Sequence, residues 1–299
     1  MAMVLLRELE NRFQADVWCE ALSADGVPYL LRTYQDTAYD GLFVSQSGYA
    51  SLFVDEQWLK KAREVDDGLM GRPPQGVDGA ADLARRIEHT LLDPAAGEAE
   101  LLAHLAQCLE MGCAAACVSP WLTARAAGEL RGGPVRVCSV VGFPLGAATS
   151  RTKLNEALEL AGDGAQELDM VINRGLVLGG GLNAAVDEVA AVAQALNGLP
   201  LKVIMETAAL GPELTQALAE ALLSSGAAFL KTGSGYFGSA SAADVQVLRA
   251  AVGRRLGIKA AGGIRDLDQA LALIGAGADR LGASNGHAIW LEARRRWPD

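Results

Sequence analysis

The 299-residue chain has little of what usually marks a nucleic-acid-binding or membrane protein. Aromatic residues make up only 5% of it, and 36 acidic residues outnumber 26 basic ones, for a net charge of -10. An acidic balance of this size argues against nucleic acid or an anionic membrane as the main partner. No apolar run reaches the length of about 18 residues that a membrane span needs. The first residues also lack the basic stretch and long apolar run of a signal peptide, so we expect a cytoplasmic protein.

Cysteine and histidine are scarce as well. The five cysteines are Cys19, Cys108, Cys113, Cys117 and Cys138, and the three histidines are His89, His104 and His287. The odd number and scattered positions of the cysteines do not suggest a disulfide framework, so free thiols are expected. Too few of these residues recur at metal-ligand spacing to predict a zinc site.

What the chain does have is length and apolar content: 51% of its residues are hydrophobic and 34 are glycine. The run from Asp66 to Gly76 carries paired prolines among glycines and acids, which is typical of a linker. We therefore predict a small α/β domain at 1–66, a linker at 67–80 and a larger domain at 81–299. For the small domain we predict strands at 3–7, 29–33, 42–44 and 51–54, a helix at 12–23, and a closing helix capped by Asp55 that runs through Ala62.

After the linker, short apolar strands alternate with alanine- and leucine-rich helices. The predicted strands are 87–91, 115–119, 135–141, 167–172, 201–206, 228–232, 258–261 and 280–283, and helices are expected at 98–111, 184–196, 212–225 and 266–275. Alternation through eight units predicts parallel strands, and eight is the number that closes a (β/α)8 TIM barrel. An open doubly wound sheet is the alternative, but it would more typically have a glycine-rich phosphate loop after its first strand.

Two lysines, Lys231 and Lys259, lie in segments that otherwise have the pattern of buried strands. An unpaired ammonium is costly to remove from water, so two such residues suggest a chemical task. A desolvated lysine beside a second cation loses its proton more easily and becomes an amine nucleophile. Two structural lysines remain the alternative, although buried ion pairs are costly substitutes for apolar packing.

Side chains alternate between the two faces of a strand. This alternation places further charges on the faces that carry the two lysines: Asp169 with Glu167, and Lys202 with Glu206. Charged residues are unusual in a barrel interior, which branched aliphatic side chains normally fill. Lys202 could equally serve only to neutralise a neighbouring carboxylate, and Asp169 could be a plain ion-pair partner.

Glycines cluster just after the last three predicted strands. Gly233 and Gly235 follow Lys231, a run from Gly262 to Arg265 follows Lys259, and another from Gly282 to Gly286 closes the eighth strand. In (β/α)8 enzymes the loops after strands seven and eight commonly bind phosphate through backbone N–H groups. Glycine lets the backbone approach the phosphate oxygens. A phosphate pocket is therefore predicted at these strand ends.

From Ile87 to about Ser284 the chain resembles the deoxyribose-phosphate aldolases, class I aldolases of the barrel fold. The matching stretches are IEHTLL (87–92), CVSP (117–120), VGFPLG (141–146), ELDMVIN (167–173), LKVI (201–204), FLKT (229–232) and KAAGGIR (259–265). The resemblance implies that Lys231 forms a Schiff base and that Lys259 is the cation favouring its neutral amine. It further implies that Asp169 takes part in proton transfer.

The resemblance also implies a substrate site. Its residues would be Lys202, Glu88, Cys117, Gly235, Gly262, Gly263, Gly282 and Ser284. Cys117 could equally pack as a small hydrophobic residue. Two positions depart from the family pattern: Glu88 stands where aspartate is usual, and Gly233 stands where the family has a serine.

We therefore predict an aldolase that reversibly cleaves 2-deoxy-D-ribose 5-phosphate, a small phosphosugar, to glyceraldehyde 3-phosphate and acetaldehyde. No metal or organic cofactor is needed, because the imine is the electron sink. One alternative is a Schiff-base aldolase for a different phosphosugar, and another is a non-catalytic sugar-phosphate sensor. A homodimer is the expected assembly. The small N-terminal domain lies outside the resemblance and is loosely similar to small signal-transducing domains of unknown function.

Overall fold

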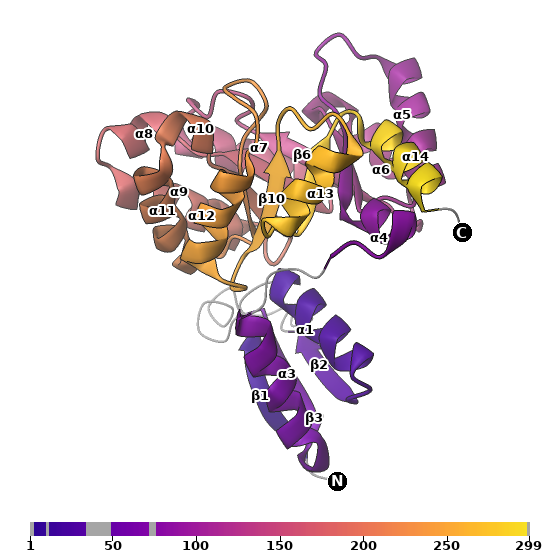
Figure 1. Cartoon of the computed structure of the whole chain (residues 1–299). Helices are drawn as coiled ribbons and strands as arrows, with labels where there is room; N and C mark the ends of the chain where they lie inside the picture. Colours follow the sequence, from indigo (N-terminus) through magenta and orange to yellow (C-terminus); the bar gives the residue numbers. More distant parts are fainter. Residues whose placement is uncertain (1–2, 10–11, 34–48, 72–75, 298–299) are drawn as a thin grey trace.

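The computed structural model describes residues 3–9, 12–33, 49–71 and 76–297. Within them the chain forms two separate sheets: a three-stranded antiparallel sheet near the N-terminus and a closed barrel of eight strands (Figure 1). The barrel strands are parallel and follow one another around the barrel in chain order. The predicted (β/α)8 barrel is confirmed, and the open sheet is excluded because the last strand pairs with the first.

The barrel strands are short and almost wholly buried. They are β4 (Ile87–Leu91), β5 (Ala115–Val118), β6 (Arg136–Val141), β7 (Glu167–Val171), β8 (Leu201–Ile204), β9 (Phe229–Lys231), β10 (Gly257–Ala261) and β11 (Arg280–Ala283). Each agrees with a predicted strand to within two residues at either end. The agreement is close because both faces of a parallel barrel strand are covered, which leaves a continuous apolar run in the sequence.

Helices surround the barrel, and their apolar faces form one continuous core with its outer surface. They are α4 (Gly79–Arg86), α5 (Glu98–Met111), α6 (Thr123–Glu129), α7 (Ser150–Gly162), α8 (Arg174–Leu178), α9 (Leu182–Ala195), α10 (Thr207–Leu210), α11 (Pro212–Ala221), α12 (Ala242–Val252), α13 (Leu267–Gly275) and α14 (Gly286–Arg296), with 3-10 turns η2 (Pro120–Leu122) and η3 (Leu222–Ser224). Thr149, Ser241 and Asp266 begin three of these helices, each accepting a backbone N–H of the first turn.

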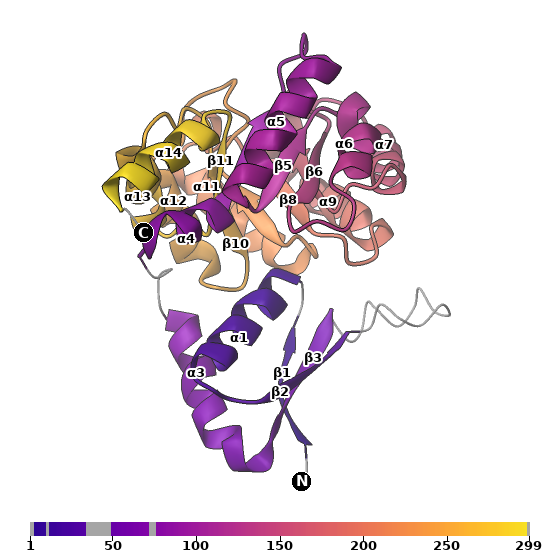
Figure 2. The same ribbon diagram turned by 90° about the vertical axis from the view of Figure 1, so that its right-hand side faces the viewer.

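The described part of the chain before the barrel, residues 3–71, is called the N-terminal unit here. It contains β1 (Met3–Leu9), α1 (Arg12–Ala24), β2 (Tyr29–Thr33), β3 (Ala50–Asp55), the 3-10 turn η1 (Glu56–Trp58) and α3 (Leu59–Gly71). Both helices lie on one face of the sheet (Figure 2). They enclose an apolar core of their own around Trp18, Leu22 and Leu52. Asp55 caps η1 as expected, accepting the backbone N–H of Gln57 at 3.1 Å.

Helical structure enters the predicted linker from both sides, since α3 continues to Gly71 and α4 already begins at Gly79. The helix α3 continues because Val65 and Leu69 pack against the core of the N-terminal unit. Between them Asp66 accepts a hydrogen bond from Arg7 at 2.8 Å. The strand predicted at 42–44 lies outside the described residues.

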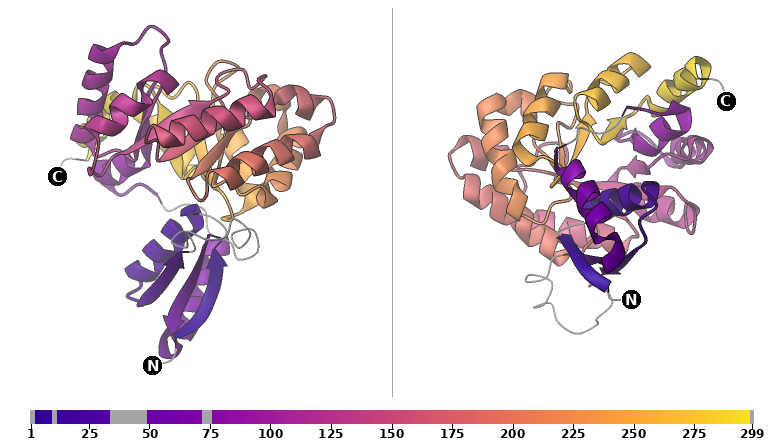
Figure 3. Two further views of the ribbon diagram at one scale, coloured as in Figure 1. Left: turned by 180° about the vertical axis from the view of Figure 1, so that it is seen from behind. Right: turned by 60° about the horizontal axis from the view of Figure 1, so that its bottom comes forward.

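The N-terminal unit lies at the end of the barrel where the strands begin (Figure 3). There Val17 of α1 packs against Ala228 and Phe229 at the start of β9. The loops that follow the strands lie at the opposite end and are free to form a substrate site. Among the described residues, no helix is both long and apolar enough to cross a membrane.

Candidate active site

Seven charged side chains meet inside the barrel, carried by six of its strands. They are Glu88 (β4), Glu167 and Asp169 (β7), Lys202 (β8), Lys231 (β9), Lys259 (β10) and Arg280 (β11). The side chain of Arg280 is 15% exposed, and the other six are no more than 4% exposed. The alternation of strand faces thus brings the predicted residues Lys231, Lys259, Asp169, Lys202 and Glu88 together.

Asp169 lies at the centre of the group. Its Oδ2 accepts hydrogen bonds from Lys231 Nζ at 2.8 Å and from Lys259 Nζ at 2.7 Å. Its Oδ1 accepts one from Lys202 Nζ at 3.1 Å. The register places Lys231 directly opposite Lys259 on neighbouring strands, which is why both amines reach one carboxylate oxygen. The two lysines therefore share a partner.

Glu88 is a charge partner within the same group. Its Oε2 accepts a short hydrogen bond from Lys259 and lies 3.3 Å from Lys202 Nζ, while its Oε1 lies 3.3 Å from Arg280 Nη1. The longer glutamate side chain thus contacts three cations at once. The structure thus places the Glu88 carboxylate beside the lysines inside the barrel, and not among the loops that follow the strands.

Glu167 and Arg280 are members of the group that sequence reasoning did not assign to the site. Glu167 pairs with Lys202 at 2.6 Å, with Arg280 at 2.9 Å and with Arg136 at 2.7 Å. The signal for Arg280 was present in the sequence: it stands two residues before Gly282, so strand alternation gives both the same face. Glu167 was placed on the inward face, but without a role.

The pKa values of these groups are shifted by their neighbours. Burial alone raises the pKa of the Asp169 carboxyl, but the surrounding lysine charges, that of Lys202 first, hold it well below its usual range. The pKa values of Glu88 and Glu167 are lowered in the same way against the effect of burial. Burial alone lowers the pKa of Lys202 and Lys259, but the carboxylates, Asp169 first, raise both above the usual value. All five groups are therefore charged at neutral pH.

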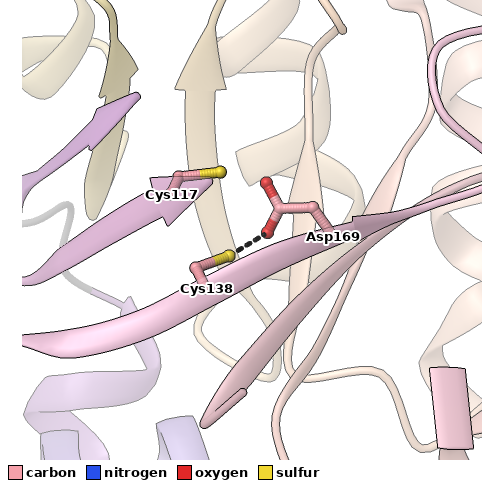
Figure 4. A group of neighbouring side chains, drawn as sticks. All are labelled: Cys117, Cys138 and Asp169. Atoms are coloured by element: carbon pink, nitrogen blue, oxygen red, sulfur yellow. Dashed lines mark hydrogen bonds between the residues drawn. The ribbon is translucent and has the colours of Figure 1, made fainter. Parts of the chain in front are cut away.

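Cys117, Cys138 and Asp169 form the one group of potential metal ligands found among the described residues (Figure 4). Their ligand atoms lie within 4.8 Å of one another, and the Cys138 thiol donates to Asp169 Oδ1 at 3.3 Å. Lys202 Nζ is 3.5 Å from Cys138 Sγ, and both other site lysines bind the same carboxylate. A divalent cation would have to displace these charges, so the residues do not fit a resident metal. Cys117 therefore lies beside Asp169 in the barrel interior, and its part in substrate binding stays a prediction.

A small hollow, called the mouth here, lies at the carboxyl ends of β8, β9 and β10. Its lining includes Thr232, Gly233, Ala261 and Glu206. Glu206 was predicted to share the inward face of β8, but it lies beyond the strand in the left-handed region (φ 59°), where alternation no longer applies. Its Oε1 accepts the backbone N–H of Ser234 at 3.0 Å. Sequence reasoning therefore missed Glu206 as a residue of the mouth.

The predicted phosphate-binding residues divide into two sets. Gly235, Gly262 and Gly263 lie together at the mouth: all three have positive φ, and a Cβ on Gly262 would come 3.3 Å from the Cα of Gly235. Ser284 is exposed at the end of β11. Gly282 differs, because a Cβ there would lie 2.8 Å from Lys259 Cε. Its missing side chain makes room for the lysine inside the barrel.

Comparison with models of known protein families gave no match. A deoxyribose-phosphate aldolase of a Picosynechococcus species is 44% identical over 211 residues, which are 71% of this chain and 92% of that protein. Another, from Thermosynechococcus vestitus, is 45% identical over 203 residues, 68% of this chain and 93% of that protein. The tetrameric deoxyribose phosphate aldolase of Aeropyrum pernix has a similar solved structure, with a TM-score of 0.68 and 32% identity over 73% of this chain and 93% of that one. The chain belongs to the deoxyribose-phosphate aldolase family.

Proposed function

We propose that the protein reversibly cleaves 2-deoxy-D-ribose 5-phosphate to glyceraldehyde 3-phosphate and acetaldehyde, through an imine on Lys231. One observation carries the assignment: Lys231 Nζ lies 2.8 Å from Asp169 Oδ2, the oxygen that also binds Lys259. Among the three lysines of the group, Lys231 alone has any exposed surface, at 4%. It is the amine that a substrate could reach.

The balance of charge supports Lys231 as the nucleophile. The three carboxylates of Glu88, Glu167 and Asp169 are already paired with Lys202, Lys259 and Arg280, and Arg136 contacts Glu167 from the end of the barrel where the strands begin. Lys231 is the additional basic group, so its proton would add an uncompensated charge to a closed interior. Uncompensated buried charge is costly, which favours the neutral amine. A neutral amine attacks a carbonyl.

The residues then divide the work of the reaction. Lys231 attacks the open-chain aldehyde at C1, and loss of water gives an iminium. The C2–C3 bond then breaks as the C3 hydroxyl loses its proton, which releases glyceraldehyde 3-phosphate and leaves a two-carbon enamine on Lys231. Protonation of the enamine at C2 and hydrolysis of the imine release acetaldehyde. Asp169 is charged and touches the reacting amine, so it stabilises the iminium and moves protons to and from the C3 hydroxyl, directly or through a water. Lys202 and Lys259 hold Asp169 in place.

The mouth supplies orientation. Backbone N–H groups beside Gly235, Gly262 and Gly263, together with the Ser284 hydroxyl, would bind the phosphate. Glu206, an acceptor at the hollow, suits a sugar hydroxyl better than a phosphate, because two anions would repel each other. A phosphate held away from the reacting carbons helps to orient them.

Borohydride reduction with acetaldehyde tests the imine. We expect an ethyl group on the peptide that contains Lys231, and none on peptides that contain Lys202 or Lys259. Turnover of 2-deoxyribose 5-phosphate by the same preparation is measured in parallel. The mechanism would be contradicted if the wild-type protein turned over substrate without forming an adduct and the Lys231→Leu variant kept that turnover.

Glu88 and Gly233 favour a second candidate, a Schiff-base aldolase for another phosphosugar. Both depart from the family pattern, and Gly233 borders the hollow. Turnover rates over a panel of phosphorylated aldoses separate the two candidates. A sugar-phosphate sensor is the third candidate, and it predicts binding without turnover.

We further propose that residues 1–66 fold as a separate domain and that the protein assembles as a homodimer. The separate apolar core of the N-terminal unit supports the first proposal. Light scattering at several concentrations tests the second. Five free cysteines are consistent with the reducing conditions of the cytoplasm.

A further inference from the structure

The end of the barrel opposite the mouth carries a chain of ion pairs that leads to the active site. Arg136, the first residue of β6, lies between two carboxylates: its Nη1 is 2.7 Å from Glu167 Oε1 and its Nη2 is 3.8 Å from Asp16 Oδ2 of α1. Glu167 Oε2 is 2.6 Å from Lys202 Nζ, which in turn donates to Asp169 at 3.1 Å. Each step is a contact between opposite charges.

Glu167 is the first residue of this series of ion pairs whose side chain lies inside the barrel. Its side chain is 1% exposed, yet it has three cationic partners, Arg136, Lys202 and Arg280. Arg136 binds Oε1 and Lys202 binds Oε2, while Arg280 contacts both oxygens, at 3.2 Å and 2.9 Å. Without Arg136, Oε1 would keep only the longer contact with Arg280, and the negative charge of Glu167 would be shared by two cations instead of three.

This redistribution of charge would matter because Lys202 also contacts Asp169, the residue that touches the reacting amine. A stronger pair between Lys202 and Glu167 would weaken the one between Lys202 and Asp169. The position of Arg136 is therefore coupled to the carboxylate that moves protons, although Arg136 itself touches no reacting atom.

The N-terminal unit holds the same end of the barrel. Gln14 Nε2 donates to the backbone oxygen of Arg255 at 3.0 Å, and Val17 packs against Phe229. Asp16 lies between these two anchors and faces Arg136. Helix α1 thus carries the outer partner of the arginine.

We infer that Arg136 is a positioning residue of the aldolase, which fixes Lys202 against Asp169 through Glu167 and is itself held by α1. The inference rests on the proposed function. It gives the N-terminal unit a part in catalysis, as a support for the closed end of the barrel.

The test compares full-length Arg136→Met, Arg136→Lys and Asp16→Asn with the wild type. Arg125→Met is the matched control, because Arg125 also bridges two carboxylates, Glu98 and Glu129, but is half-exposed and lies away from the interior. For Arg136→Met we expect kcat to fall roughly tenfold or more, the scale of one charged hydrogen bond. KM should change little, since the mouth is untouched.

Two further readouts separate positioning from a loss of fold. The acid limb of the kcat profile should move to higher pH in Arg136→Met, because removing a cation makes the interior carboxylates easier to protonate. Arg136→Lys should recover most of kcat, and Asp16→Asn should lower it by about fivefold at most, because it removes a surface pair. If Arg136→Met does not fold, the pH profile and kcat of Arg136→Lys and Asp16→Asn decide.

The outcomes remain distinct from those that test the proposed function. An inactive wild type that gives no borohydride adduct would overturn both ideas, since there would be no reaction to position. An active wild type, with Arg136→Met matching Arg125→Met in kcat and pH profile, would overturn the inference alone. A lower melting temperature with unchanged kcat would also overturn it.

Discussion

Buried lysines occur in two regions of this molecule, and only one of them has the arrangement of an active site. Outside the barrel, Lys153 of α7 donates to Glu188 of α9 at 2.8 Å and to the backbone oxygen of Val171 at 2.8 Å. Inside it, three lysines and an arginine share three carboxylates. The first arrangement is a one-to-one pair that connects α7, β7 and α9, whereas the second has more basic groups than acidic ones.

The electrostatics differ in the same sense. Burial lowers the pKa of Lys153, and its partner Glu188, with a smaller contribution from Glu156, does not fully offset it. Several carboxylates raise the pKa of Lys202 and Lys259 in spite of complete burial. A buried lysine is therefore not by itself evidence of catalysis. The indicative feature is a basic group in excess, at the end of a strand that opens to a mouth.

The largest expected effect is that of Lys231→Leu. Turnover should fall to the background of the assay, because no other amine of the group is exposed to substrate. The fold should persist, since Asp169 keeps its contacts with Lys202 and Lys259 and every interior carboxylate still has a cationic partner. Circular dichroism and a thermal melt check the fold. Residual turnover, together with a borohydride-reducible adduct on another lysine, would contradict the assignment of Lys231 as the nucleophile.

A smaller loss is expected for Lys202→Met. Lys202 holds Asp169, the residue that moves protons, without being the nucleophile. The fall in kcat should therefore lie within the roughly 10²- to 10⁴-fold share of the acid–base group that it positions. Imine formation with acetaldehyde should persist and be detectable by mass. Loss of the adduct together with kcat would show instead that Lys202 is needed for the attack itself.

Much of this arrangement can be predicted from the sequence, because strand alternation is regular where strands are buried on both faces. It places Lys231, Lys259 and Asp169 in one interior. It fails at Glu206, where a left-handed residue ends the alternation. It also cannot reveal Lys153, whose partner lies 35 residues away on another helix. No local pattern links two such positions before the chain has folded.

Lys153→Met tests the other side of the comparison. It leaves the Glu188 carboxylate buried without its cation, so the free energy of unfolding should fall by about 3–5 kcal/mol. The kcat of the folded fraction should stay unchanged, since the pair lies outside the barrel interior. Urea unfolding and active-site titration measure the two quantities. A variant with normal stability and reduced kcat would contradict the comparison, because it would give the Lys153–Glu188 pair a part in catalysis and none in stability.

The smallest effect on activity is expected for Glu88→Asp, which shortens one of the three carboxylate side chains inside the barrel. Glu88→Asp restores the residue usual in the family, and Lys259 keeps Asp169 at 2.7 Å, so kcat/KM should change by only about two- to fivefold, equivalent to less than 1 kcal/mol. Glu188→Asp makes the same change where Lys153 has one carboxylate partner among the described residues. There the free energy of unfolding should fall by about 1–3 kcal/mol, the cost of a weakened buried hydrogen bond. Kinetics and urea unfolding of both variants check the pair. A larger loss of stability in Glu88→Asp than in Glu188→Asp would contradict this comparison. It would show that each ion pair inside the barrel is as indispensable as the isolated pair of Lys153 and Glu188.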